Sequence, residues 1–223
     1  MTDYYVLHSG GLDSTAALAL VTKRPDARNV VAVGVNYGQR HVKELVAAEA
    51  IRAELAVESA TLDLTGYGQS VTSALTSDID VPEGHYADDN MAVTVVPGRN
   101  AVMLSAVAGL AASRSTNHPA VVVTAVHAGD HTVYADCRPE FVDAIDAALR
   151  AGCGVSVEAP FVNVTKTDIA RIGYENNSPA HLTWSCYKGS EKHCGRCGTC
   201  VERREAFTDA GLVDPTDYET GAN

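Results

Sequence analysis

The sequence predicts an α/β fold in which helices cover both faces of a mostly parallel sheet. Short apolar runs alternate with longer segments of helical spacing, which is typical of parallel strands joined by crossover helices. The length of 223 residues suits one domain with a small appendage, and a hydrophobic content of 46% is enough for a buried core. A glycine turn after the first apolar run marks the sheet edge where ligands bind in such folds.

The first half of the chain has the pattern of three strands and two helices. Strands are predicted over residues 4–8, 30–36 and 61–64, and helices from Leu12 and over residues 42–55. Residues 65–90 are rich in Gly, Ser and Asp and are predicted to form a long loop, which in a compact domain is usually functional or mobile.

The second half continues the alternation. Pro97-Gly98-Arg99-Asn100 precedes a small-residue helix that is predicted to end near Arg114, and residues 120–126 form a strong strand pattern. Pro139 suits the first turn of a helix reaching Arg150. A strand over residues 155–157 and a helix beginning at residues 165–168 complete the predicted sheet and its cover.

The charge balance argues against a nucleic-acid partner. Lys and Arg number 17 against 28 Asp and Glu, a net charge of −11, whereas nucleic-acid binders normally carry a basic stripe. The longest strongly apolar stretch without charge, residues 101–113, is shorter than the roughly 20 residues that span a bilayer. We therefore expect no membrane attachment. No basic, apolar leader begins the sequence, so its six cysteines suggest metal binding or catalysis in a reducing cytoplasm.

The glycine turn after the first predicted strand has the composition of a pyrophosphate site. Its residues are Ser9-Gly10-Gly11-Leu12-Asp13-Ser14-Thr15. Glycines allow a ligand to approach the backbone, and the following helix directs free N–H groups and its positive dipole end at the loop. A carboxylate here is consistent with a phosphate if Mg²⁺ lies between them. The alternative is a plain glycine turn with Ser and Asp capping; the spacing excludes a Walker A loop and a dinucleotide fingerprint.

Four cysteines near the end of the chain have the spacing of a metal site. Cys186, Cys194, Cys197 and Cys200 are separated by seven, two and two residues. Four thiolates close a tetrahedral Zn²⁺ site and leave no open position, so a zinc ion here is expected to be structural. An iron–sulfur cluster is the main alternative, since it also uses four thiolates. Cys137 and Cys153 are expected to be small buried hydrophobes.

The glycine turn resembles the Ser-Gly-Gly-x-Asp-Ser loop of the ATP pyrophosphatase superfamily, and further motifs narrow the resemblance. They are Tyr37-Gly38-Gln39-Arg40-His41, Pro97-Gly98-Arg99-Asn100, Asp136-Cys137-Arg138-Pro139-Glu140-Phe141, Lys166-Thr167-Asp168-Ile169 and residues 183–200. Together they are similar to the 7-cyano-7-deazaguanine synthase family over residues 6–207. Many members have Ser-Gly-Tyr-Pro before Asp-Cys-Arg, where this chain has Thr132-Val133-Tyr134-Ala135.

The resemblance implies a fold, a reaction and a set of ligands. The fold is Rossmann-like, of the adenine-nucleotide α-hydrolase type, with an ATP-binding domain over residues 1–182 and a zinc-binding helical segment over residues 183–223. The reaction converts 7-carboxy-7-deazaguanine and ammonia to the nitrile through an adenylated carboxylate, an amide and an adenylated amide, releasing AMP and pyrophosphate. The resemblance further implies structural Zn²⁺, Mg²⁺ with ATP, a homodimer and a cytoplasmic enzyme of queuosine biosynthesis.

Site residues follow from the same motifs. Pyrophosphate is assigned to Ser9, Gly10, Gly11, Ser14 and Thr15, and Mg²⁺ to Asp13. Lys166 and Arg99 are candidates for neutralising phosphate charge, with a surface salt bridge as the alternative for each. Substrate contacts are assigned to Gln39, Arg40, Asp136 and Arg138, and a base for ammonium to His41. Helix capping or core packing is the alternative for His41, and a turn ion pair for Asp136 and Arg138.

Three other functions are weighed against this assignment. A tRNA thiolase of the same superfamily needs a basic surface, which the charge argues against. A non-catalytic zinc module leaves the intact loop unexplained. A glutamine amidotransferase needs an N-terminal Cys nucleophile, and residue 2 is Thr, so free ammonia is the expected nitrogen donor. An amide-forming ligase that stops before the nitrile stays open.

Overall fold

Five parallel strands form the sheet that the sequence predicts. The computed structural model describes residues 1–38, 42–73, 94–188 and 191–219. The strands are β1 Thr2–Leu7, β2 Ala27–Asn36, β3 Glu58–Asp63, β4 Ala120–Val123 and β5 Ser156–Glu158. Their order is β3-β2-β1-β4-β5, and every strand pair is parallel. The chain thus proceeds to one side of β1 and then to the other, and open sheets bind ligands at such a reversal.

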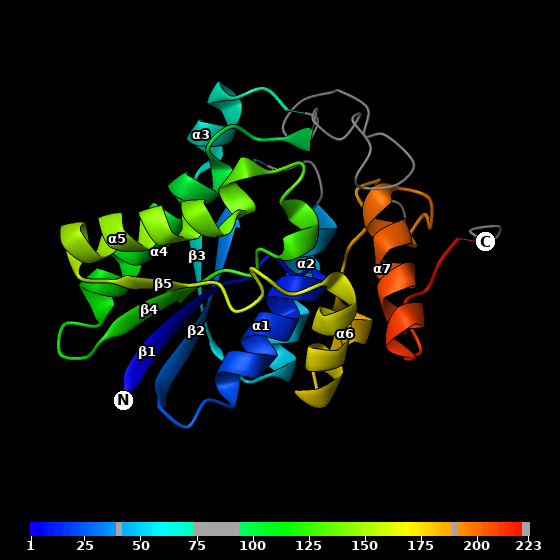
Figure 1. Cartoon of the computed structure of the whole chain (residues 1–223), viewed down its shortest axis with the longest axis horizontal. Helices are drawn as coiled ribbons and strands as arrows, with labels where there is room; N and C mark the ends of the chain where they lie inside the picture. Colours follow the sequence, from blue (N-terminus) through cyan, green and yellow to red (C-terminus); the bar gives the residue numbers. More distant parts are fainter. Residues whose placement is uncertain (39–41, 74–93, 189–190, 220–223) are drawn as a thin grey trace.

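Helices cover both faces of the sheet (Figure 1). One face is packed by α1 Leu12–Thr22, α2 Val42–Glu54 and α6 Lys166–Glu175, and the other by α4 Arg99–Arg114 and α5 Pro139–Cys153. Two further helices are the short α3 Thr65–Ser70 and the C-terminal α7 Gly198–Ala210, which packs on α6. In the described part of the chain, no helix is both long and apolar enough to cross a membrane.

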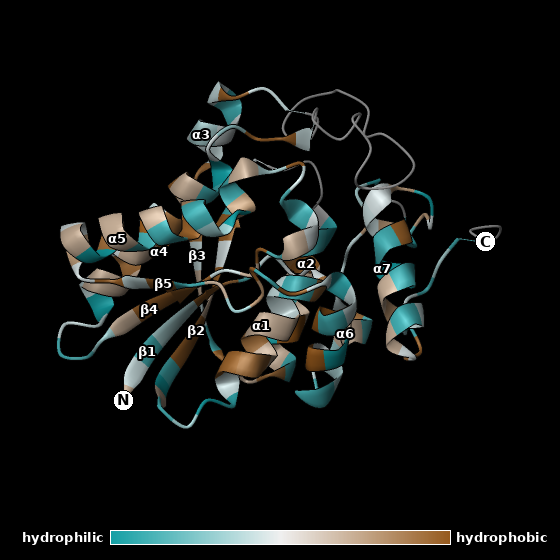
Figure 2. Cartoon of the chain, in the orientation of Figure 1, coloured by the Kyte–Doolittle hydropathy of each residue, from teal (hydrophilic) through white to brown (hydrophobic). Residues whose placement is uncertain are grey.

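The core alternates along the strands as a sheet covered on both faces requires. Tyr4 and Val6 pack under α1 and α6, whereas Tyr5 of the same strand packs under α4. Figure 2 shows the apolar colours along β4 and α1, while α6 and α7 mix polar and apolar residues. The central strands are therefore buried on both sides, and only their ends are free to build a site.

Two predicted elements differ from the structure. Residues 65–70 form α3 inside the segment predicted as a loop, because Leu64 O accepts the backbone N–H groups of Tyr67 and Gly68. Residues 74–93 of that segment lie outside the described residues. The strand predicted over residues 120–126 ends at Val123, and residues 124–127 leave the sheet to line a cavity.

Candidate active site and metal centre

The loop between β1 and α1 is a tight turn held by its own hydroxyl groups. Gly10 adopts a left-handed φ of 89°, and a Cβ there would lie 2.5 Å from the backbone oxygen of Glu44 in α2. Ser14 Oγ accepts the Ser9 N–H at 3.3 Å, and Ser9 Oγ accepts the Gly11 N–H at 3.3 Å. Only glycine therefore allows α2 to pack this closely on the turn.

The N-terminus of α1 faces the cavity without a side-chain cap. Its N-cap residue, Gly11, has no side chain to accept the first N–H groups of the helix. Ser9, Gly11, Asp13 and Ser14 all line the cavity. Thr15 differs, since it is fully buried and its hydroxyl donates to Gly11 O at 2.7 Å and contacts His8 Nε2 at 3.2 Å. The Thr15 hydroxyl therefore stabilises the turn, whereas the unbonded backbone N–H groups of the first turn of α1 are available to an anion.

Asp13 and Lys166 meet directly above this turn. Lys166 Nζ lies 2.6 Å from Asp13 Oδ2, so the start of α6 is tied to the start of α1. Among the described residues, none donates a hydrogen bond to the buried Asp13 Oδ1. Burial raises the pKa of Asp13, but Lys166 and His127 lower it further, and the carboxyl group is held ionised. An ionised oxygen without a donor is suited to a cation.

Further charged side chains surround Lys166. Glu202 Oε2 of α7 lies 3.3 Å from Lys166 Nζ, and His127 Nε2 lies 3.5 Å from it. Burial lowers the pKa of Lys166, but the carboxylates of Asp13, Glu202 and Asp130 outweigh it and raise the pKa above its usual value. Lys166 is therefore held in its charged form by the carboxylates that surround it.

His127 is a buried link between these groups. Its Nδ1 accepts the Gly129 N–H at 3.1 Å, so the neutral ring carries its proton on Nε2. Nε2 lies 3.5 Å from Asp130 Oδ2 and 3.8 Å from Asp13 Oδ2. Burial raises the pKa of Asp130, while the electrostatic effects of His127 and Lys166 oppose that rise. The residues after β1 and β4, on the two sides of the strand-order reversal, thus share one polar cluster.

A cavity of about 250 Å³ lies at this edge of the sheet. The polar cluster forms one part of its wall, and Trp184, Ser185, Tyr187 and Thr199 contribute another. Tyr37, Glu44 and Arg99 line it further along, together with Val35 and Met103. The guanidinium of Arg99 lies 5.9 Å from the centre of the Tyr134 ring. The cavity therefore combines a charged wall around Lys166 with a partly apolar wall that includes Val35, Tyr37 and Met103.

Asp136 and Arg138, which are predicted as substrate contacts, do not line the cavity. Asp136 Oδ2 accepts the Asn100 N–H at 3.1 Å and caps the start of α4, because Gly98 before that helix has no side chain. Arg138 is exposed and donates to His131 O at 2.8 Å. Among the described residues, the contacts of both side chains are hydrogen bonds and not the turn ion pair weighed as the alternative, so their assignment as substrate contacts stays a prediction. Gln39, Arg40 and His41 lie outside the described residues.

Glu44 is a cavity residue that sequence reasoning missed. It lies in the first turn of α2, and burial raises the pKa of its carboxyl group to about 7 against the opposing charge of Arg99. The sequence feature that could have identified Glu44 is its position one helical turn after His41. In the structure, its backbone oxygen lies on the side of α2 that packs against Gly10.

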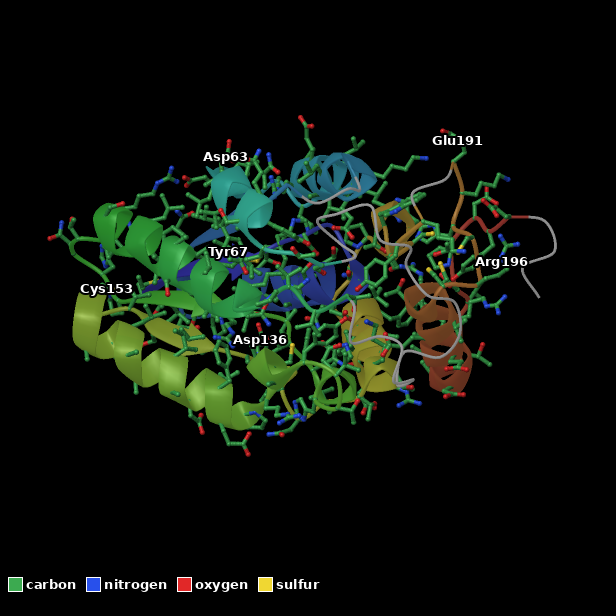
Figure 3. The ribbon with its side chains drawn as sticks, turned by 90° about the horizontal axis from the view of Figure 1, so that it is seen from above. Asp63, Tyr67, Asp136, Cys153, Glu191 and Arg196 are labelled. Carbon is green, nitrogen blue, oxygen red and sulfur yellow. The ribbon has the colours of Figure 1, made fainter. Side chains whose placement is uncertain are left out.

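The four clustered cysteines form a single buried site. Their sulfur atoms all lie within 4.8 Å of one another. Backbone N–H groups of Cys194 and Cys197 donate to Cys186 Sγ and Cys194 Sγ at 3.4 and 3.3 Å, which favours thiolates. Figure 3 shows the sulfur atoms beside α7, while Cys153 lies at the opposite side of the molecule. Cys137 is buried as expected, but Cys153 is exposed in the last turn of α5, where its thiol donates to Leu149 O.

The segment that carries the four cysteines, from Thr183 to the end of α7, is joined to the cavity through α7. Two of the cysteines, Cys197 and Cys200, lie at the start of that helix, and Glu202 follows on it. Arg203 is fully buried; its guanidinium donates to Asp214 Oδ1 at 3.1 Å and Thr183 Oγ1 at 2.6 Å. At the other end of the segment, the Trp184 N–H donates to Gly10 O at 2.9 Å. The segment therefore forms part of the cavity wall.

Comparisons with known proteins agree with this geometry. The family model for "Queuosine biosynthesis protein QueC" matches residues 4–211. A 7-cyano-7-deazaguanine synthase of Rhizobium rhizogenes is 51% identical over 219 residues, which cover 96% of this chain and 91% of the relative. One from a Chelativorans species is 47% identical over 223 residues, 98% of this chain and 94% of the relative.

A solved structure shares the fold alone. It is a predicted subunit of a tRNA methyltransferase from Methanocaldococcus jannaschii, with a TM-score of 0.52 and 14% identity over 100% of this chain and 95% of that one. The near-complete family match and the roughly half-identical relatives are far more specific. The chain therefore belongs to the QueC family, whose relatives named here are 7-cyano-7-deazaguanine synthases.

Proposed function

We propose that this protein uses ATP and ammonia to convert 7-carboxy-7-deazaguanine to 7-cyano-7-deazaguanine. The observation that carries the proposal is the Asp13–Lys166 contact at the uncapped start of α1, in a chain of this family. The site suits a ligand with several phosphates, because N–H groups, a lysine and a cation-binding carboxylate converge on one place.

The loop residues bind and orient the nucleotide in this proposal. Backbone N–H groups of the first turn of α1, from Leu12 to Ser14, and the hydroxyl groups of Ser9 and Ser14 hold pyrophosphate, while Gly10 and Thr15 shape the turn. Asp13 would hold Mg²⁺ through its free Oδ1, and the ion would neutralise phosphate charge as it develops. Lys166 adds fixed positive charge near the phosphates, and Arg99 adds positive charge further along the same cavity.

Ammonia cannot displace an oxide ion from a carboxylate, so one carboxylate oxygen must first be converted into a leaving group. The carboxylate attacks the α-phosphorus of ATP, pyrophosphate leaves, and ammonia displaces AMP to give the primary amide. The amide oxygen then attacks a second ATP, pyrophosphate leaves again, and loss of AMP with two protons from nitrogen gives the nitrile. Both activations place developing charge on the same phosphates, so one set of donors serves both steps.

We further propose that the four cysteines hold one structural Zn²⁺. Around a single tetrahedral ion with bonds of about 2.3 Å, four sulfur atoms lie roughly 3.8 Å apart. Sulfur atoms within 4.8 Å of one another suit that arrangement, whereas a four-iron cluster binds each thiolate to a different iron and needs a wider spacing. All four are buried, which suits a closed site.

The remaining assignments concern the setting of the enzyme. We propose that residues 1–182 form the nucleotide-binding domain and residues 183–223 a metal-binding segment that completes its cavity. Four gathered cysteines without a disulfide suit a reducing cytoplasm. A homodimer is proposed on the family resemblance and is checked by sedimentation.

Incubation with 7-carboxy-7-deazaguanine, ATP, Mg²⁺ and ammonium tests the reaction. Mass spectrometry should find the nitrile, and two AMP should form per product molecule. One AMP per product, with the mass of the amide, would make the protein an amide-forming ligase. Val133 and Ala135 would then be examined first, because their backbone follows Asp130 in the turn beside the cavity. Val133→Gly with Ala135→Pro should in that case raise the nitrile-to-amide ratio.

A further inference from the structure

We propose that Glu44 recognises the pyrimidine edge of the 7-deazaguanine ring and so selects the substrate. The inference rests on the proposed function, since it names the residue that reads that substrate. Glu44 shares a cavity with the phosphate-binding turn, yet the polar cluster around Lys166 does not include it.

The carboxyl group of Glu44 is available to a ligand. It lines the cavity from the first turn of α2, and among the described residues none donates a hydrogen bond to it. The charged group that acts on it is Arg99, which lines the same cavity from the start of α4. A half-buried carboxylate without a donor is costly, and a ligand with N–H groups removes that cost.

The position of Glu44 relative to the phosphate turn is rigid. Its backbone oxygen would lie 2.5 Å from a Cβ at Gly10, and Ala48 N would lie 2.7 Å from it, so α2 is packed directly on the turn. A base held by Glu44 is therefore held at a constant distance from the site of adenylation. Positioning of this kind is what brings a substrate carboxylate to an α-phosphate.

The walls beside Glu44 suit a flat heteroaromatic ring. Tyr37, Val35 and Met103 line the same cavity as Glu44, and Tyr187 lines it from the segment that carries the four cysteines. Tyr37 and Met103 are themselves buried in the core and are not free to collapse into the space. Apolar and aromatic walls of this kind exclude water from a bound ring and strengthen each hydrogen bond made beside them.

The hydrogen-bonding pattern distinguishes the two bases that the enzyme must bind. The guanine edge offers two adjacent donors, N1–H and the exocyclic amine, and a carboxylate accepts from both at once. The adenine edge offers one donor and one acceptor, and an ionised carboxylate leaves that acceptor unpaired. Glu44 therefore favours the deazaguanine over the adenine of ATP.

The test compares ligand affinities of the full-length protein and Glu44→Gln by calorimetry. An amide offers one donor and one acceptor, so it matches adenine and mismatches the guanine edge. We expect Kd for 7-carboxy-7-deazaguanine to rise about 10- to 100-fold, as for loss of a hydrogen bond to a charged group. Kd for ATP with Mg²⁺ should stay within about twofold. Glu49→Gln, an exposed change on the same helix, is the matched control and should alter neither value.

An analogue lacking the exocyclic amine makes the assignment specific. The wild-type protein should bind it about tenfold or more weakly than the substrate, whereas Glu44→Gln should show little preference. Glu44→Asp, which keeps a shorter carboxylate, should retain the preference at lower affinity and serves if Glu44→Gln does not fold. An unchanged substrate Kd in Glu44→Gln overturns the proposal, and so does a loss confined to ATP. Nitrile formation by the wild-type protein is measured separately, so failure of the reaction is distinguishable from failure of this assignment.

Discussion

Lys166 Nζ lies 2.6 Å from Asp13 Oδ2, and the contact joins the starts of α6 and α1 beside the point where the strand order reverses. The two residues are far apart in sequence and meet because α1 and α6 pack side by side on one face of the sheet. A lysine in that position holds one carboxylate oxygen and leaves the other without a donor among the described residues. The pair is thus arranged to hold a cation and an anion together.

Asp13→Asn should lower kcat by about 100-fold or more, the usual scale for removing one preorganised electrostatic group. The amide cannot supply the negative charge that a cation requires, while Lys166 keeps its ion pair with Glu202 at 3.3 Å and the fold survives. Pyrophosphate release measures the rate, and thermal unfolding measures the fold. Asp143→Asn, an exposed change on α5, is the control and should be silent. Near-normal turnover by a well-folded Asp13→Asn protein would remove the cation role.

Lys166→Met should raise KM for ATP by about tenfold or more, since a hydrogen bond between charged groups is worth about 1.5–3 kcal/mol. The loss has a second cause, because the carboxylates of Asp13, Glu202 and Asp130 would then repel phosphate without a compensating cation. Adding Glu202→Gln should therefore restore part of the affinity. If the double variant is no better than Lys166→Met, the carboxylates do not act on the nucleotide.

Cys197→Ser should lower Tm by about 10 °C or more, because binding energy at a closed four-thiolate site is folding energy. Elemental analysis should find about one zinc per wild-type chain and much less in the variant. Cys153→Ser is the matched control, since Cys153 is exposed on α5 and distant from the cluster in Figure 3. Iron in the purified protein, or a broad visible absorption, would replace zinc by an iron–sulfur cluster.

The parallel fold could be predicted because apolar alternation and glycine turns are local features. The strand order could not, since it depends on which crossover packs on which face, and neither could α3, whose polar sequence has little apolar spacing. The Asp13 loop and the four cysteines were visible as short motifs. Asp136 and Arg138 have the residue types of a binding site, but their partners, Asn100 and His131, are determined by tertiary packing. Their role therefore could not be derived from residue type.

Glu202, Asp130 and His127 are site residues that the sequence did not reveal, because tertiary packing brings them to the site. His127 and Asp130 contribute to the Lys166 cluster from the turn after β4, and the packing of α7 on α6 brings Glu202 to the cavity. The boundary predicted between residues 182 and 183 stays a prediction. The hydrogen bond from the Trp184 N–H to Gly10 O shows that the two sides are in contact at the phosphate turn.

Affinity for 7-carboxy-7-deazaguanine should fall at acid pH if Glu44 reads its pyrimidine edge. Burial raises the pKa of Glu44 to about 7, so its carboxyl group is ionised above that pH and neutral below it. The neutral form cannot accept both N–H groups, so Kd should be flat near pH 8 and rise by about tenfold per pH unit well below pH 7. The neighbouring Arg99 stays charged, and burial raises the pKa of Tyr37, so neither titrates in this range. Burial and the charge of Arg52 lower the pKa of His8, at the turn, to about 3, so His8 does not titrate in this range either.

Calorimetry from pH 5.5 to 8 measures this dependence of Kd on pH, and Glu44→Gln should remove the slope. A parallel slope in both proteins would assign the titration to another group.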